Sequence, residues 1–172
     1  MLQPLVRRTW AKRGKTPLLK AWDRHDRLTV ISAVVWEPHR HQDYRMYFQI
    51  KRHNAKADTF FWFLVELQRE LNNHMIVVWD RLSGHRKAAR AMQELELPWI
   101  KFEYLPAYCP ELNPVEHVWS TTKYGRLANW PAPDVDALHD RVQQELHKQC
   151  QDRPLLRNHF RWAGLETDAL LC

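Results

Sequence analysis

The sequence predicts an α/β protein with a mixed sheet flanked by helices, and three observations carry this prediction. Two strand-like segments follow one another near the N-terminus, at residues 28–36 and 44–52. A short apolar segment at 75–79 and a short strand-like segment at 100–104 then alternate with stretches of helical periodicity. The 172 residues are 45% hydrophobic and 27% charged, which is enough apolar surface for one folded domain. A hairpin followed by alternating helices and strands indicates a mixed sheet.

The two strands of the predicted hairpin differ in pattern. Residues 28–36 are apolar on both alternating faces, as in a strand that is covered on both sides. Residues 44–52 alternate between apolar and polar, so we expect one solvent-facing side and a place near the sheet edge. The apolar face of this second strand comprises Tyr44, Met46, Phe48 and Ile50.

The remaining elements are predicted from period and from helix-ending residues. Residues 57–72 have apolar side chains at helical spacings of 4, 3 and 4, at Phe60, Leu64, Leu67 and Leu71. A wholly apolar, buried strand is expected at 75–79, and another short strand is expected at 100–104. Further helices are expected at about 86–96, 115–126 and 135–150, with a proline-rich loop over 105–114.

Composition excludes several classes of protein. The three cysteines are too few for a disulfide framework and match no zinc spacing, which favours a reducing, cytoplasmic setting. No apolar run reaches the roughly 18 residues of a membrane span, so no membrane partner is expected.

The net charge of +6 is unevenly distributed along the chain. Residues 1–56 carry a net +9, whereas residues 57–172 carry a net −3. Such asymmetry indicates a surface that faces nucleic acid, although a solvated basic face has the same signature. The candidate phosphate contacts in the first segment are Arg7, Arg8, Lys12, Arg13 and Lys15.

Two carboxylates stand at positions where ligand sites form. Asp80 directly follows the 75–79 strand, at the strand end where α/β sheets place their ligands, although a turn-forming aspartate is the alternative. Glu116 is the third helical residue after Asn113 and Pro114, a near match to a capping box, which would be a purely structural role. If the two carboxylates meet, they suit Mg2+ or Mn2+, which would polarise a phosphate and activate water or a 3′-hydroxyl.

The ordered motifs around these acids resemble the catalytic domain of mariner-type DDE transposases, nearest to their bacterial insertion-sequence branch. They are Val77-Val-Trp-Asp80, His85, Leu105-Pro-Ala-Tyr-Cys-Pro-Glu-Leu-Asn-Pro-Val-Glu116-His-Val-Trp119 and Lys123. The segment Arg8-Thr-Trp-Ala-Lys-Arg-Gly-Lys-Thr-Pro17 is similar to another stretch of that family. The 35 residues between Asp80 and Glu116 are close to the usual spacing, and the resemblance covers roughly residues 5–125.

The resemblance implies a ribonuclease H-like fold and a metal site of three acids, of which Asp80 and Glu116 would be the second and third. The first acid of the family lies on the first, central strand, before the Arg8 segment. No acid precedes Asp23 here, and neither Asp23 nor Asp26 matches that position. We therefore expect residues 1–130 to form a partial catalytic domain without its first central strand, and residues 131–172 to form a helical extension.

The resemblance also implies DNA transposition by metal-dependent strand cleavage and 3′-hydroxyl strand transfer, by a homodimer on DNA ends and target. Without the first acid, we expect the chain to be inactive alone and to need complementation by an upstream transposase fragment. The alternative is an inactive remnant that only binds DNA or partners a complete transposase.

Further candidate residues lie near the acids, and Lys123, seven residues past Glu116, would lie on nearly the same helical face. His85 and Asn113 would support the site, and Lys123 and Arg126 would contact DNA, with an ordinary surface role as the alternative. Arg81 occupies a position where the family usually has asparagine, so it would either bind phosphate or neutralise the metal site.

Overall fold

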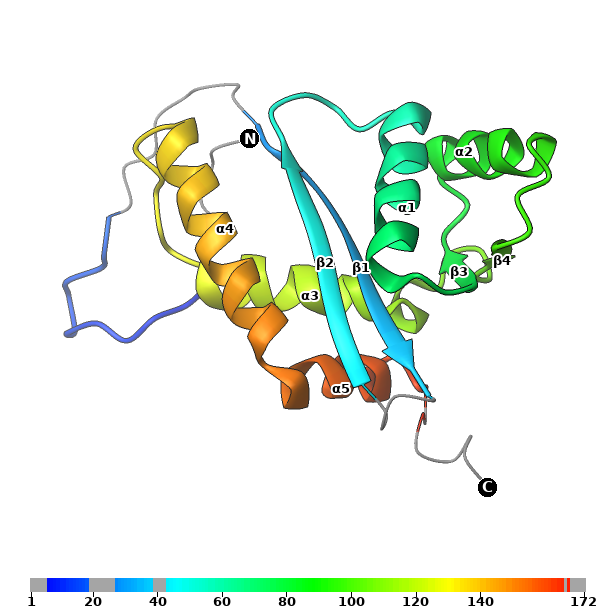
Figure 1. The fold of residues 1–172 in the computed structure, drawn as a ribbon. Helices are drawn as coiled ribbons and strands as arrows, with labels where there is room; N and C mark the ends of the chain where they lie inside the picture. The colour runs from blue at the N-terminus through cyan, green and yellow to red at the C-terminus, as the bar shows by residue number, and fades with distance from the viewer. Residues whose placement is uncertain (1–5, 19–26, 39–42, 166, 168–172) are drawn as a thin grey trace.

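A computed structural model describes residues 6–18, 27–38, 43–165 and 167 of the chain. The predicted α/β class is confirmed (Figure 1). Its elements are, in order, β1 (Thr29–Glu37), β2 (Asp43–Lys51), α1 (Ala57–Leu71), β3 (Met75–Trp79), α2 (Ser83–Glu94), β4 (Ile100–Tyr104), the 3-10 turn η1 (Pro110–Leu112), α3 (Pro114–Ser120), the π-helix η2 (Thr121–Arg126), α4 (Val135–Gln151) and α5 (Arg153–Trp162).

The described strands form two separate two-stranded sheets. β1 and β2 pair antiparallel, from Thr29 opposite Lys51 to Glu37 opposite Asp43. β3 and β4 pair in parallel, with Trp79 opposite Tyr104 at the carboxyl end. Within the described residues, β1 and β3 therefore each have one edge without a strand partner.

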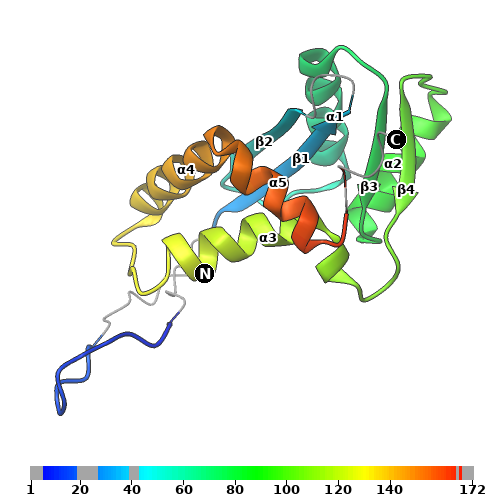
Figure 2. The same cartoon turned by 90° about the horizontal axis from the view of Figure 1, so that it is seen from below.

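Helices cover both faces of the β1–β2 hairpin (Figures 1 and 2). One apolar cluster joins Ile31 to α1, α2 and the β3–β4 pair, and Ala33, Val35 and Tyr47 pack against it. A second cluster joins Tyr44 and Met46 to α3, α4 and α5. The predicted burial of β1 on both sides is confirmed.

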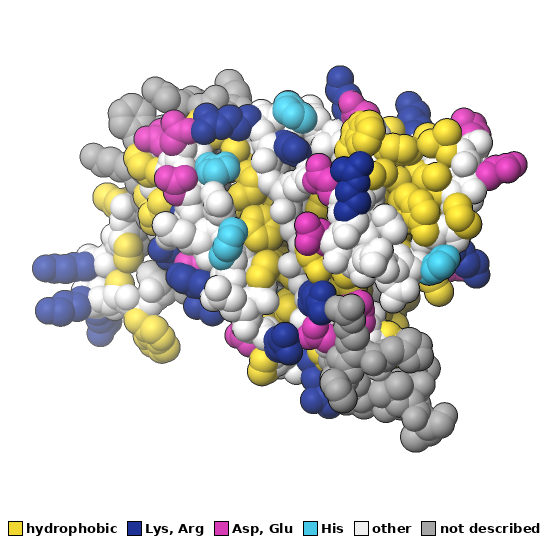
Figure 3. Space-filling view, in the orientation of Figure 1, with side chains coloured by type: hydrophobic (Ala, Val, Ile, Leu, Met, Phe, Trp, Pro, Cys, Tyr) yellow, Lys and Arg dark blue, Asp and Glu magenta, His cyan; other side chains and the backbone are white. Residues whose placement is uncertain are grey.

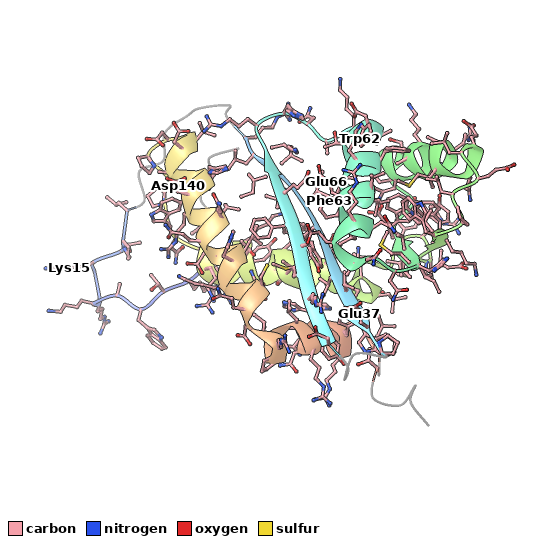
Figure 4. All side chains as sticks on the ribbon, viewed as in Figure 1. Lys15, Glu37, Trp62, Phe63, Glu66 and Asp140 are labelled. Carbon is pink, nitrogen blue, oxygen red and sulfur yellow. The ribbon has the colours of Figure 1, made fainter. Side chains whose placement is uncertain are left out.

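The side of β2 that the sequence predicts to face solvent is only partly exposed. Tyr47 on that side packs against the cluster around α1, and Gln49 donates a hydrogen bond to Glu66 of α1. Figure 4 shows Glu66 and Phe63 on the side of α1 that faces the hairpin. Gln49 therefore has a polar partner on α1, and Glu66 remains exposed to solvent.

The expectation that β3 is buried holds for only part of the strand. Met75 and Trp79 are buried, whereas Ile76 is 67% exposed and Val78 is 56% exposed. Because successive strand residues point to opposite faces, β3 has one face on the α1–α2 core and one open apolar face.

Three helical segments differ from the prediction. α2 begins at Ser83, three residues earlier than predicted, and a Cβ atom at Gly84 would lie 2.8 Å from the ring of Phe60. The helix expected over 115–126 divides into α3 and η2, where buried Thr122 donates to Val118 O and accepts from Gln149 of α4. α5 is not predicted at all.

Helix α5, which the sequence analysis does not predict, nevertheless has local helix-start signals in its sequence. Asp152 accepts a hydrogen bond from Leu155 N at 3.0 Å, and Pro154 stands in the first turn. α4 and α5 pack on β2 and on each other. No helix in the described part of the chain is long and apolar enough to cross a membrane.

Candidate active site

Asp80 and Glu116 lie in one pocket. The cavity measures about 360 Å3, and it is formed where the β3–β4 pair meets the start of α3. Its lining comprises Asp80, Arg81, Leu105, Pro106, Ala107, Tyr108, Cys109, Pro110, Asn113 and Glu116. The structure therefore brings together the two acids that the sequence places 35 residues apart.

Parallel strand pairing explains why the two acids converge. Trp79 is paired with Tyr104, and the ladder continues one step further because Leu105 N donates to Trp79 O at 2.9 Å. Asp80 thus leaves β3 at the same sheet edge where the chain leaves β4 toward Glu116. This edge, beyond the carboxyl ends of parallel strands, is the usual ligand site of α/β sheets.

One oxygen of Asp80 is held by the protein. Its Oδ1 accepts a hydrogen bond from Leu82 N at 2.9 Å and lies 2.6 Å from Nδ1 of His85. The Leu82 contact is the turn that the structural alternative foresaw, so Asp80 does stabilise the β3–α2 connection. Oδ2 has no protein partner among the described residues, and the Asp80 side chain is 55% exposed. One carboxylate oxygen is therefore available to the pocket.

His85 is itself fixed by aromatic contacts. Its ring stacks on Trp79 with centroids 4.6 Å apart and planes 4° apart, and meets Phe60 edge-on at 4.4 Å. With its ring held from two directions, its Nδ1 can keep Asp80 in one rotamer. The predicted role of His85 in supporting the site thus has a geometric basis. The sequence did not predict that Trp79 and Phe60 hold the His85 ring. The only available signals were the position of Trp79 before Asp80 and of Phe60 in the apolar stripe of α1.

Glu116 is released from the capping role that the sequence allowed. Asn113 does cap α3, since its Oδ1 accepts from Val115 N at 3.1 Å. The reciprocal half of a capping box is missing, because Asn113 N donates to Pro110 O at 3.0 Å instead. Glu116 is exposed, and its carboxylate has no hydrogen-bond or ion-pair partner in the described ranges. Its side chain is therefore free to bind a ligand.

The loop between β4 and α3 forms one wall of the pocket. Tyr108 adopts a left-handed conformation, with φ of 61°, and its side chain is fully exposed. Pro106 and Pro110 flank it, and proline restricts the backbone on either side. The loop thus presents an aromatic ring to solvent at the rim of the pocket.

The two acids fit a hard divalent cation in part. Mg2+ is typically held through one or two carboxylates with water and substrate phosphates, and Asp80 Oδ2 and the Glu116 carboxylate are partner-free oxygens of this kind. Within the described residues, no group of three or more metal-binding side chains is found. Asp23 and Asp26 lie outside the described residues.

The basic residues of the first segment form an extended arm over residues 6–18, which projects from the body of the protein (Figures 1 and 3). We call this the basic arm; its cations are Arg7, Arg8, Lys12, Arg13 and Lys15. Its base is attached where Arg7 N donates to Asn129 Oδ1 at 2.8 Å. Its tip turns at Gly14, whose φ of 80° suits glycine, and Lys15 stands at this tip in Figure 4. All five cations are exposed.

Lys123 and Arg126 do not line the pocket. Lys123 is exposed on the π-helix η2, whose helical period differs from that of α3. Arg126 lies 3.9 Å from the buried carboxylate of Glu145, which also binds Arg141 and Lys148. The structure thus gives Arg126 a structural partner and leaves Lys123 available at a distance from the two acids.

Comparison with known proteins identifies the family and supports the fold. The sequence pattern of the family described as DDE superfamily endonuclease matches residues 1–139. The chain therefore belongs to the DDE superfamily of endonucleases, and the predicted family resemblance is confirmed.

A solved structure shows the same fold. The chain in the crystal structure of the Mos1 strand transfer complex superposes with a TM-score of 0.60 at 17% identity. The match covers 96% of this chain and 48% of that chain, so the present chain spans about half the length of its structural relative. No curated protein matches the sequence.

Proposed function

We propose that this chain is catalytic machinery of a mariner-type transposase of the bacterial insertion-sequence branch, acting on DNA in the cytoplasm. The reaction would be metal-dependent cleavage of a DNA strand followed by transfer of its 3′-hydroxyl to target DNA. One observation carries the proposal: Asp80 and Glu116 share a pocket, and each has carboxylate oxygen without a protein partner. The DDE family match and the likeness to the Mos1 strand transfer complex support it.

The residues divide the work in this proposal. Asp80 and Glu116 would hold Mg2+ or Mn2+, which when bound supplies charge for a phosphate and lowers the pKa of a bound water. His85 keeps Asp80 Oδ1 in place, which leaves Oδ2 directed to the ligand. Asn113 starts α3 at the position that carries Glu116 to the pocket. The basic arm and Lys123 would contact DNA phosphates outside it.

We also propose that the site is completed by a strand and an acid from another transposase segment, and that the working form is a homodimer or such a complemented assembly. The support is the unpaired edge on both β1 and β3 within the described residues, together with the open apolar face of Ile76 and Val78. Strand edges readily accept an extended segment of another chain. Two acids alone are expected to be inactive.

A second candidate function rests on the presence of only two acids in the pocket that the described residues form. If no further acid is supplied, the exposed basic arm still allows the protein to bind DNA or to join a complete transposase as an inactive partner. This second function predicts that the protein binds DNA without cleaving it.

Plasmid nicking distinguishes the candidates. The full chain is incubated with supercoiled DNA and Mn2+, alone and after co-expression with transposase segments that supply a further strand and an aspartate. We expect no nicking alone, and nicking on complementation that is lost in both Asp80→Ala and Glu116→Gln. Nicking that survives Asp80→Ala would contradict the site, and DNA binding without nicking in any combination would favour the second candidate.

A further inference from the structure

Arg81 is a cation inside the acidic pocket that the proposed mechanism does not use. It directly follows Asp80, it lines the same cavity as Glu116, and its side chain is exposed. The resemblance to transposases leaves two roles open for it, either phosphate binding or neutralisation of the acids. The structure distinguishes them by what the guanidinium contacts.

Arg81 makes no ion pair or hydrogen bond with either acid, or with any other part of the chain that the structure describes. Acids and arginines elsewhere in the protein do pair when they are neighbours. Asp43 binds Arg45 at 2.8 Å and Arg153 at 3.3 Å. A guanidinium that neutralised the acids should show such contacts, so the charge of Arg81 is available for a ligand.

The ligand should be an anion, and its surroundings favour a phosphate of the DNA backbone. Arginine presents a planar fork of N–H donors that matches two phosphate oxygens, a geometry that lysine lacks. Asp80 and Glu116 together carry two negative charges and repel a phosphodiester whenever no cation is bound. One arginine at the same pocket offsets part of that repulsion at the place where the backbone must approach.

We propose that Arg81 forms a phosphate-binding subsite in this pocket, which holds a backbone phosphate of DNA beside Asp80 and Glu116. That the ligand is DNA rests on the proposed function, whereas the availability of the guanidinium rests on the structure alone. The subsite acts before and without the divalent cation. Arg81 thereby increases the affinity for DNA instead of lowering the affinity for metal.

The test measures binding of a fluorescent DNA duplex by the full chain in EDTA, over a series of salt concentrations. The variants are Arg81→Asn and Arg81→Lys, with Arg90→Asn as the matched control. Arg90 is also exposed, it stands on α2, and it does not line the pocket. Both asparagine variants remove the same charge from the protein, so only the loss of a specific contact separates them.

We expect Arg81→Asn to reduce the slope of log affinity against log salt by about 0.9, the value for one lost phosphate contact. Arg90→Asn should leave the slope unchanged, and Arg81→Lys should restore the slope with weaker binding, because the charge returns without the fork. An Arg81→Asn slope equal to that of Arg90→Asn would overturn the proposal. So would tighter Mn2+ binding by Arg81→Asn with unchanged DNA affinity, which would assign Arg81 to neutralisation.

Two further outcomes separate the ligand and the underlying function. Inorganic phosphate at matched ionic strength should not displace the duplex, and displacement would identify free phosphate as the ligand and overturn the assignment to DNA. Because EDTA removes the metal, absence of nicking leaves this measurement intact. A wild-type chain that does not bind DNA would overturn both proposals, whereas an unchanged slope with intact nicking would overturn only the role of Arg81.

Discussion

His159 should make the stability of the protein fall steeply in mild acid. Its side chain on α5 is fully buried, and neither ring nitrogen has a hydrogen-bond partner among the described residues. The ring of His117 lies parallel to it at a centroid distance of 6.4 Å, and Trp162 packs against both rings. Burial lowers the pKa of His159 from 6.5 to about 4, with a further lowering by His117 and a partial opposing effect of Asp152.

The sign and size of the effect follow from proton linkage. The folded state keeps His159 neutral, whereas the unfolded chain takes up a proton at its ordinary pKa, so acid favours unfolding. The contribution of the neutral His159 ring to the free energy of unfolding is fully present above about pH 6.5, and it is lost as the pH falls toward about 4. A pKa difference of this size corresponds to about 3 kcal/mol, a large part of the about 5–15 kcal/mol by which proteins are stable.

Urea unfolding of wild type and His159→Phe between pH 7.5 and 4 measures this contribution. Phenylalanine retains a ring without nitrogens to protonate, so the free energy of unfolding of the variant should gain about 3 kcal/mol on wild type as the pH falls. His74→Phe is the matched control, because His74 is exposed and its ring has no contact in the described structure. Parallel pH profiles for wild type and His159→Phe would refute the reasoning.

Three other predictions concern the site and the arm. His85→Phe keeps the stacking but loses the bond to Asp80, so nicking by the complemented protein should fall about 10–100-fold with little change in Tm. His85→Asn should restore part of the nicking activity. Equal activity of wild type and both variants would exclude a positioning role for His85. Gly84→Ala places a methyl 2.8 Å from Phe60 and should cost about 1–3 kcal/mol in urea unfolding, whereas Gly125→Ala, with open space around it, should cost little. Glutamine at all five cations of the basic arm should lower the salt slope of DNA binding by about 0.9 for each phosphate contact that it makes, and an unchanged slope would remove the arm from the interface.

Elements with strong periodicity could be predicted from the sequence almost to their ends. α1 follows the apolar stripe through Phe60, Leu64, Leu67 and Leu71, and all four are buried. β3 and β4 have the predicted bounds. In these segments the side chains that form the core are encoded by local spacing, so local reasoning suffices.

The candidate site could be predicted as a set of residues but not as a geometry. Asp80 and Glu116 were identified from their places after a strand and at a helix start, together with an ordered family motif. Whether each carboxylate was free or used as a cap depended on competing hydrogen bonds. Asn113 N donates to Pro110 O, so the Glu116 carboxylate is not used to cap the helix. The spacing of residues in the sequence does not predict which of these two hydrogen bonds forms.

The sequence by itself determined the α/β class, the identity of the two acids and the basic arm, because periodicity, motif order and charge are properties of neighbouring residues. Tertiary structure alone decided that Gly84 of α2 lies close against Phe60 and that His85 is held between Phe60 and Trp79. It also decided that Arg81 has no partner among the described residues although it lines the pocket of the two acids. These outcomes depend on contacts between segments far apart in the chain. Their energies are comparable to local propensities, so local patterns cannot decide between them.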